Sequence, residues 1–168
     1  MITASLHDSG WTLSPLAEAE IIEVMTWFPD ARSVDIWGGP KFRFPFTAET
    51  FREDCRLDLM QSWVLRNAHG QLAAFGQAYE RDGRGHLARL VSNPGLRRQG
   101  AGRQLIEMII ASLEETRAYD EYSLFVYRHN TAAYRCYLSL GFAVQDYPDD
   151  APMPEKCYFL TRRMTRRK

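Results

Sequence analysis

The hydrophobic and polar positions divide the chain into a helical first part and a longer second part in which extended and helical segments alternate. Apolar side chains recur at helical spacing from residue 16 to residue 28, and the Ser14-Pro15 pair before them has the composition of a helix start. Residues 30–46 follow no regular period but gather aromatic residues, glycines and prolines. We expect a loop there that either packs over the core or forms part of a binding wall.

Thr47 has the residue type of an N-cap, and it predicts a short helix that runs to Leu59, with Thr50 and Glu53 spaced as in a capping box. After this helix the pattern changes from helical to extended. Apolar runs bounded by turn residues predict a short strand at Trp11–Leu13 and further strands at 62–66, 72–79, 86–92, 122–127, 142–146 and 158–164. A last helix is expected at 131–140.

Short turns join the strands at 62–66, 72–79 and 86–92, which predicts an antiparallel three-stranded meander. The strand at 86–92 is followed by a helix and then by the strand at 122–127. Such a crossover connection makes its two strands parallel neighbours. The elements together predict an α/β (α+β) fold in which helices flank a mixed sheet.

The stretch from His86 to Leu113 contains the most informative local chemistry. The turn signal Asn93-Pro94-Gly95 ends a strand and is followed by the basic, glycine-rich loop at 97–102 and an amphipathic helix. Free backbone N–H groups and the positive helix end point at such a loop. Gly100 and Gly102 lack a Cβ atom, so a phosphate can approach the backbone closely. The stretch predicts an anion site; a basic turn that merely opens a helix is the alternative.

Two well-known phosphate-binding loops do not match this stretch. No Lys-Ser or Lys-Thr pair follows Gly102, as the phosphate loop of kinases and GTPases requires. The dinucleotide-binding pattern needs a third glycine where this chain has Leu105. The spacing that does occur is R-x-x-G-x-G, formed by Arg97, Gly100 and Gly102. It resembles the pyrophosphate-binding motif of the GNAT superfamily, the acyl-CoA-dependent N-acyltransferases.

A second motif supports this resemblance. The aromatic and apolar run at 122–127 is typical of a buried strand, and Asn130 then opens a helix that stops at Gly141. The pattern formed by Asn130, Ala133, Tyr137 and Leu140-Gly141-Phe142 is similar to the second half of the GNAT core. The resemblance covers about residues 62–164 and implies a mostly antiparallel sheet in which one parallel strand pair splays apart to admit the pantetheine arm of acyl-CoA.

The resemblance also implies which residues hold the acyl-CoA. Backbone N–H groups of the basic loop would bind the pyrophosphate, while backbone groups at the end of the preceding strand would bind the pantetheine and the thioester carbonyl. Asn130 would contact the pantetheine, although an asparagine before a helix is also a good N-cap. The implied cofactor-binding residues are Leu90, Val91, Ser92, Arg97, Arg98, Gln99, Gly100, Ala101, Gly102 and Asn130.

By the same resemblance, Tyr137 would protonate the CoA thiolate as it leaves, a role that favours a pKa near operating conditions. Tyr134, one helical turn earlier, is the rival, and packing by the ring alone is the structural alternative. For the general base, Glu80 at the end of a central strand is the best acid, and His86 and His129 are candidates by their ordinary pKa. A water chain is a further possibility.

One position departs from a branch of the superfamily. N-terminal peptide acetyltransferases often carry a glutamate five residues before the asparagine, where this chain has Phe125. The departure argues against a peptide N-terminus as the acceptor. The acidic positions Asp146, Asp149 and Asp150 could attract a cationic amine, or they form an ordinary solvated loop.

Composition narrows the function class further. The chain has 168 residues, 45% hydrophobic and 25% charged, with 21 basic and 21 acidic residues and no net charge, which gives no reason to expect nucleic acid as a partner. No apolar run is long enough to span a membrane, and the first residues do not resemble a signal peptide. Three cysteines without metal-ligand spacing indicate a reducing cytoplasm and no metal site. We expect one domain over residues 1–168.

These observations predict an acetyl-CoA-dependent N-acetyltransferase that acts on a primary amine of a small molecule or a protein, possible as a homodimer by analogy with the superfamily. The primary amine attacks the thioester directly, without a covalent enzyme intermediate. A non-catalytic acyl-CoA-binding module is the alternative reading. A kinase or nucleotide-binding protein is disfavoured because the phosphate-loop lysine is missing.

Overall fold

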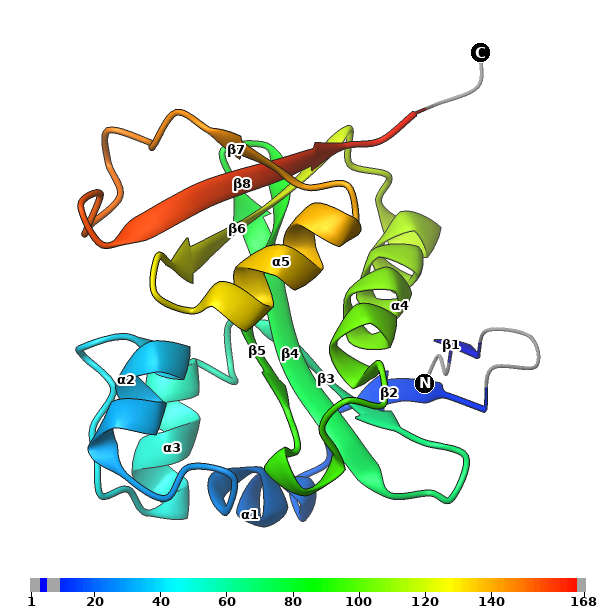
Figure 1. Ribbon diagram of the computed structural model, residues 1–168. Coiled ribbons are helices and arrows are strands. Elements are labelled where there is room, and N and C mark those ends of the chain that lie inside the picture. Colours follow the sequence, from blue (N-terminus) through cyan, green and yellow to red (C-terminus); the bar gives the residue numbers. More distant parts are fainter. Residues whose placement is uncertain (1–3, 6–9, 166–168) are drawn as a thin grey trace.

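The computed structural model describes residues 4–5 and 10–165, which form one mixed sheet with helices on both faces (Figure 1). The strands are β1 (Ala4–Ser5), β2 (Thr12–Pro15), β3 (Gln61–Arg66), β4 (Leu72–Arg81), β5 (Arg84–Ser92), β6 (Glu121–Tyr127), β7 (Ala143–Gln145) and β8 (Cys157–Arg163). The helices are α1 (Glu20–Met25), α2 (Ala31–Gly38), α3 (Ala48–Cys55), the 3₁₀ turn η1 (Pro94–Leu96), α4 (Ala101–Thr116) and α5 (Thr131–Ser139).

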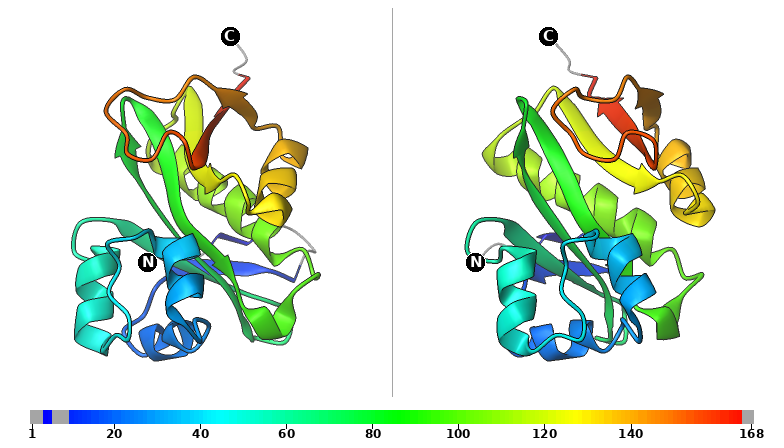
Figure 2. Two further views of the ribbon diagram at one scale, coloured as in Figure 1. Left: turned by 60° about the vertical axis from the view of Figure 1, so that its left-hand side comes forward. Right: turned by 90° about the vertical axis from the view of Figure 1, so that its left-hand side faces the viewer.

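The strand order is β1-β2-β3-β4-β5-β6-β8-β7, and every neighbouring pair is antiparallel except β5 and β6. These two parallel strands are paired only at Gly85 with Tyr122 and at His86 with Ser123. Beyond that point they diverge, and Figure 2 shows the resulting V between the green and yellow strands. The predicted meander, the parallel pair and its splaying are all confirmed.

The turns of the meander follow from local residue chemistry. In the β3–β4 turn, the Asn67 side chain accepts hydrogen bonds from the backbone N–H groups of His69 and Gln71, both at 3.0 Å. In the β4–β5 turn, Asp82 and Gly83 both have positive φ, at 51° and 77°. Two left-handed residues in succession match the right-handed twist of the strands that they join. These short turns bring β3, β4 and β5 side by side.

The predicted helix start at Ser14-Pro15 is wrong. Both residues belong to β2, where they pair with Val64 and Trp63 of β3. Proline is tolerated here because, among the described residues, β1 pairs with Thr12 and Leu13 only, and no described strand pairs with Pro15 on that side. The helix predicted over 16–28 is correspondingly short and covers only Glu20–Met25.

The segment 30–46 contains a helix that its irregular pattern did not predict. The Asp30 side chain accepts a hydrogen bond from the Ser33 N–H at 2.8 Å, and Ser33 caps the Asp30 N–H in return. This capping box begins α2, which ends before Gly39. The aromatic side chains pack over the core, because the Trp37 ring stacks on Phe28 with centroids 4.3 Å apart and lies 5.7 Å from Phe51.

The prediction of an N-cap at Thr47 is confirmed, but the helix it opens is shorter than expected. The capping box links Thr47 to Thr50, not Thr50 to Glu53. The helix ends at Cys55 because Arg56 adopts a left-handed conformation with φ of 54°, a common way to stop a helix. A turn then leads to β3.

Two clusters of buried side chains lie on opposite faces of the sheet. On one face, α4 and α5 pack over the sheet through residues such as Leu105, Ile109 and Tyr137. On the other face, α1, α2 and α3 pack through residues such as Val24 and Phe51. We call these the α4 face and the α1–α3 face. Within the described residues, no helix is long and apolar enough to cross a bilayer.

Candidate active site

The basic loop between β5 and α4 has the backbone geometry of an anion site. Arg98 and Gly100 are both left-handed, with φ of 66° and 82°. Every backbone N–H from Arg97 to Arg103 lacks an acceptor among the described residues, and the first helical bond of α4 is that from the Gln104 N–H to the Gly100 carbonyl at 3.1 Å. Unpaired N–H groups in such a loop, beside the positive end of a 16-residue helix, attract phosphate.

The loop starts from a rigid anchor at Asn93. Its side-chain oxygen accepts the Gly95 N–H, and its amide donates to the Leu72 carbonyl, both at 2.9 Å. Its backbone N–H also donates to the Ala73 carbonyl at 2.8 Å. The predicted turn Asn93-Pro94-Gly95 therefore ties the end of β5 to β4 before the chain enters the loop.

The strand that precedes the loop is irregular. In the pairing of β4 with β5, Gln77 lies opposite Ala88 and Phe75 opposite Val91, so Arg89 and Leu90 together face Gly76. This is a β-bulge, and Arg89 has a left-handed φ of 49° there. The Trp37 indole N–H of α2 donates to the Arg89 carbonyl at 2.8 Å and so holds the bulge in place.

Glycine at position 76 allows α4 to pack directly over this bulge. A Cβ atom on Gly76 would lie 2.9 Å from Leu90 Cδ2 and about as close to Ile109 and Leu105 of α4. The anion loop, the bulge and the splayed end of β5 are thus joined into one unit. The contact of backbone groups of Leu90, Val91 and Ser92 with the pantetheine and the thioester, which the resemblance implies, stays a prediction.

Asn130 lies at the other side of the splay, between the end of β6 and the start of α5. It occupies the N-cap position, but its side chain makes no capping hydrogen bond. No other hydrogen bond of its side chain occurs among the described residues, whereas its backbone N–H donates to the Tyr127 carbonyl at 2.9 Å. The structure removes the capping alternative and leaves the amide available to a ligand.

Tyr137 lies on α5 within the core of the α4 face, and only 9% of it is exposed. Its ring is 6.4 Å from that of Phe142 in an edge-on arrangement. Burial raises the pKa of its phenol well above the ordinary value, so the group stays protonated. The lowered pKa that the acid role favours is therefore not found. The rival Tyr134 is partly exposed and lies against the Tyr158 ring, 4.8 Å away.

Glu80 is not brought together with the loop or Tyr137. It pairs in register with Gly85, at the end where β5 and β6 are still joined, and the splay opens in the other direction. Its carboxylate makes a 2.5 Å ion pair with Arg117, and its side chain is 44% exposed. The role of Glu80 as general base stays a prediction for which the structure adds no support.

The two histidines differ in what they can do. His86 is buried between the rings of Tyr79 and Phe125, and its Nδ1 atom lies 2.8 Å from the Ser123 hydroxyl. Burial lowers the pKa of His86 to about 3, so it is neutral and weakly basic at neutral pH. His129 is exposed and stacks on the Tyr127 ring at 5.2 Å. Of the two, only His129 is open to solvent.

Sequence reasoning missed the residues that gather on the α1–α3 face beside the splay. Arg89 lies partly buried on the bulge, and Asp35 of α2 is near enough to Tyr127 of β6 to reinforce the burial that raises the pKa of that phenol. α2 therefore lies over the gap between β5 and β6. The sequence signal for this helix was the Asp30–Ser33 capping pair, in a segment that its aromatic residues had marked only as a loop over the core or a binding wall.

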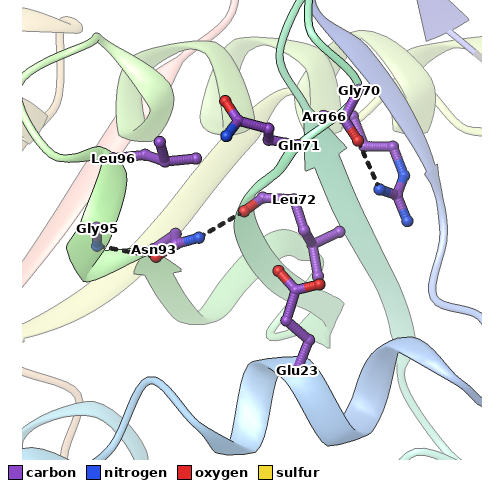
Figure 3. A pocket seen from close by; sticks show the side chains of 8 residues that line it. All are labelled: Glu23, Arg66, Gly70, Gln71, Leu72, Asn93, Gly95 and Leu96. Atoms are coloured by element: carbon purple, nitrogen blue, oxygen red, sulfur yellow. Dashed lines mark hydrogen bonds between the residues drawn. The ribbon is translucent and has the colours of Figure 1, made fainter.

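Two surface pockets lie beside this unit. One of about 300 Å³ adjoins the start of the loop and is lined by Glu23, Arg66, Gly70, Gln71, Leu72, Asn93, Gly95 and Leu96 (Figure 3). The figure shows the Asn93 side chain between the Gly95 N–H and the Leu72 carbonyl. The other, of about 290 Å³, lies between α4 and the end of α5. Among the described residues, no group of three or more His, Cys, Asp or Glu side chains could hold a metal ion.

The charges around the loop suit a polyanion. Arg97 and Arg98 are exposed, and neither has an ion-pair partner within the described part of the chain. Arg103 donates to the Ser139 hydroxyl. A Cβ atom on Gly102 would meet only Ser92 Oγ, at 3.6 Å, so the protein itself does not fill the space in front of it. The residues present fit the pyrophosphate of CoA.

Comparison with known proteins decides the family. The model of the Acetyltransferase (GNAT) family matches residues 24–142. The chain belongs to the GNAT acetyltransferase family. The match includes the basic loop, the bulge and all of α5, which are the parts that form the unit described above. As a member of this family it is an acyltransferase of the acetyl-CoA-dependent N-acetyltransferase class.

Solved structures show the same fold. The ribosomal-protein-S18-alanine N-acetyltransferase from Escherichia coli is 22% identical, with a TM-score of 0.65 over 94% of this chain and 96% of that one. A spermidine N-acetyltransferase from Vibrio cholerae, solved with CoA and spermine, is 15% identical, with a TM-score of 0.70 over 92% and 95%. AAC(6')-Ib, solved with ribostamycin and coenzyme A, is 19% identical, with a TM-score of 0.72 over 92% and 93%.

Proposed function

We propose that this GNAT protein transfers the acetyl group of acetyl-CoA to a primary amine of a small molecule or peptide. The observation that carries the proposal is the anion loop itself: its unpaired N–H groups from Arg97 to Arg103 lie next to a splayed strand pair and a bulge. The loop would bind the pyrophosphate, and the pantetheine arm would pass between β5 and β6. The single domain predicted over residues 1–168 and a cytoplasmic location are part of this proposal.

In the proposed arrangement the reacting groups enter from opposite faces of the sheet. The loop, α4 and α5 place the acyl-CoA on the α4 face, and the acceptor amine reaches the thioester from the α1–α3 face. The uncharged amine nitrogen attacks the thioester carbonyl carbon, the C–S bond breaks, and the amine proton is lost as CoA takes up a proton on sulfur. The products are an N-acetyl amide and free CoA.

The residues of the loop, Asn130 and Tyr137 have definite roles in this proposal. The backbone N–H groups of the loop, including those of Gln99 and Ala101, would hold the pyrophosphate, and Arg97 and Arg98 would add charge-assisted hydrogen bonds. Asn130, whose amide the helix does not use, would contact the pantetheine. Tyr137, kept protonated by burial, would donate a hydrogen bond to the leaving sulfur. Because its raised pKa lies above that of a thiol, stabilisation of the thiolate fits better than complete proton transfer.

The test separates binding from chemistry. Calorimetric titration of the wild type with CoA and acetyl-CoA should show binding, and the Gly100→Asp, Gly102→Asp double variant should lose it because two carboxylates would occupy the anion site. Thiol release from acetyl-CoA is then followed with a panel of primary amines. Absence of CoA binding to the folded wild type would overturn the proposal. ATP serves as the control ligand, and we expect it not to compete.

Replacement of Tyr137 by phenylalanine tests the donor. Because no hydrogen bond of the Tyr137 hydroxyl occurs among the described residues, Tyr137→Phe should leave the fold and the affinity for CoA nearly unchanged while kcat for thiol release falls by about 10²–10⁴-fold. The matched control is Tyr134→Phe, which should retain most of the activity. Equal loss in both variants would argue that neither hydroxyl acts at the sulfur.

A further inference from the structure

Arg89 is a partly buried cation without a counter-ion. Its guanidinium donates to the Gln77 side-chain oxygen at 3.0 Å and contacts the Met60 sulfur at 3.4 Å. Its buried Nε atom has no hydrogen-bond partner, and no carboxylate forms an ion pair with it within the described part of the chain. A guanidinium has five N–H donors, so most of its hydrogen-bonding capacity is unused.

The position of Arg89 is set by neighbours that hold it firmly. Gln77 is fully buried, and its amide nitrogen donates to the Cys55 carbonyl and to the Ser62 hydroxyl, both at 2.9 Å. With the amide fixed in this way, the Gln77 oxygen has to face the guanidinium. The Trp37 indole holds the Arg89 carbonyl from the other side. The positions of both the Arg89 backbone and its guanidinium are therefore fixed by hydrogen bonds.

The charges nearby do not neutralise Arg89. Asp54 lies near enough to Arg89 to act on it electrostatically. It forms no ion pair with Arg89, however, because Arg43 holds it: the Arg43 Nε and NH2 atoms donate to both carboxylate oxygens at 3.0–3.3 Å. Arg56, a second cation, lies near enough to add to the burial that lowers the pKa of Arg89. Arg56 is exposed and has no ion-pair partner within the described residues. Two cations, Arg89 and Arg56, thus lie near each other beside the hydrogen bonds of the buried Gln77 amide.

The face of the sheet on which the Arg89 guanidinium lies decides whether it can bind the phosphates of CoA or a different anion. The guanidinium lies on the α1–α3 face, as its contacts with Gln77 and Met60 show. The pyrophosphate loop opens α4, which packs on the opposite face. Arg89 is therefore separate from the phosphate contacts, and it belongs to the side from which the proposed acceptor approaches the bulge.

We propose that the acceptor of this enzyme carries an anionic group, a carboxylate in addition to its primary amine, and that Arg89 binds it. This inference rests on the proposed acetyltransferase function. A guanidinium pairs with a carboxylate through two parallel hydrogen bonds, which orients the acceptor as well as attracting it. The same charge repels a second ammonium group, so polyamines are poor acceptors and amino-acid-like amines are good ones.

The test uses conjugates that need no knowledge of the natural acceptor. The sulfur of CoA is joined through an S-acetamide link to glycine, β-alanine or γ-aminobutyrate, and each conjugate has a neutral counterpart made with methylamine, ethylamine or propylamine. Dissociation constants are measured by calorimetry for the wild type, Arg89→Met and Arg89→Lys. Arg84→Met is the matched control, because Arg84 lies on the same strand but already pairs with Glu121.

We expect at least one carboxylate conjugate to bind the wild type about ten-fold or more tightly than its neutral counterpart, since a charge-assisted hydrogen bond is among the stronger ones. The advantage should vanish in Arg89→Met, shrink in Arg89→Lys and persist in Arg84→Met, while the affinity for CoA itself stays constant. Arg89→Lys retains a donor for Gln77 if the methionine variant does not fold.

The two proposals fail in different ways. If CoA and all conjugates fail to bind, the acetyltransferase proposal is wrong. If CoA and the neutral conjugates bind but no carboxylate conjugate gains affinity in the wild type, or the gain survives in Arg89→Met, only the inference about Arg89 is overturned. The same holds if a conjugate with spermidine binds more tightly than every carboxylate conjugate.

Discussion

His86 shows how its surroundings change the chemistry of a single residue. By its ordinary pKa it is a candidate base, but it is only 2% exposed, with two aromatic rings and the Ser123 hydroxyl around it. Charging this imidazole would place an uncompensated cation in the core, near the Arg81 cation that also disfavours it. We interpret the pair of His86 and Ser123 as part of the join between β5 and β6.

The burial of His86 predicts a pH dependence of stability. Its pKa is lowered to about 3 in the folded protein, from 6.5 in the unfolded chain. Between these values the unfolded chain binds the proton and the folded protein does not. The contribution of the neutral His86 side chain to the free energy of unfolding is therefore complete above pH 6.5 and is lost as the pH falls toward 3. One proton changes the free energy of unfolding by about 1.4 kcal/mol per pH unit.

Urea unfolding of His86→Gln and of the wild type between about pH 4 and about pH 7 checks this expectation. The variant should lose the part of the slope that His86 supplies. His69→Gln is the control: His69 is exposed in the β3–β4 turn, so its removal should leave the slope unchanged. Identical slopes in His86→Gln and the wild type would show that the imidazole is not held neutral.

At the scale of elements, the start of α4 combines two demands that conflict. Glycine in a helix is less stable than alanine by up to about 1 kcal/mol, and Gly102 lies in the first turn of α4 with room for a Cβ atom. Packing within the described part of the protein therefore does not explain why position 102 lacks a Cβ atom. Close approach of a phosphate to the backbone is a reason that the fold alone does not supply.

Gly102→Ala should accordingly raise the stability of the protein slightly and weaken its affinity for CoA by about ten-fold or more, the size expected for losing one charge-assisted contact. Thermal unfolding without ligand and calorimetric titration with CoA measure the two effects. Ser112→Ala, farther along α4, should change stability alone. If Gly102→Ala binds CoA as the wild type does, close phosphate contact at this position is excluded.

At the scale of the whole molecule, the sheet consists of two parts with a narrow join. β1 to β5 form one part and β6 to β8 the other, and the strands of the two parts pair only at Gly85 with Tyr122 and His86 with Ser123 (Figures 1 and 2). This join sets the angle of the V and hence the width of the opening for a pantetheine arm. A change at the join should act on both stability and binding.

Gly85→Ala tests this coupling. The added Cβ atom would lie 2.6 Å from the Tyr122 ring and 3.0 Å from Tyr119, so the strands have to shift. Overpacking of this kind costs about 1–3 kcal/mol, and we expect a comparable loss in denaturant unfolding together with weaker CoA binding. Gly102→Ala provides the contrast, since its binding loss comes without destabilisation. Unchanged stability of Gly85→Ala would contradict the close contact.

The oligomeric state belongs to this scale as well. The expectation of a homodimer came from analogy with the superfamily and stays a prediction. Light scattering at several protein concentrations would measure the state of this chain.

The sequence by itself determined the features whose causes are local. The loop at 97–102, the turns of the meander, the period of α4 and the order of strand, helix and strand between 86 and 127 depend on glycine dihedrals, helix ends and spacing within a short stretch. These were sufficient to predict the parallel pair. The splaying was implied by the resemblance to GNAT proteins, and the acyl-CoA contacts of individual residues stay a prediction. The helix start at Ser14-Pro15 was wrong because β2 pairs with a strand nearly fifty residues away.

Only the tertiary structure decided the features that depend on which side chains meet. It showed that His86 is buried, that the Asn130 amide is not used as a cap, and that Glu80 pairs with Arg117 at the joined end of the V. It also placed Arg89 against Gln77 without an ion pair among the described residues. Burial and the distance between charges are set by contacts between distant segments, and no local pattern in the chain contains them.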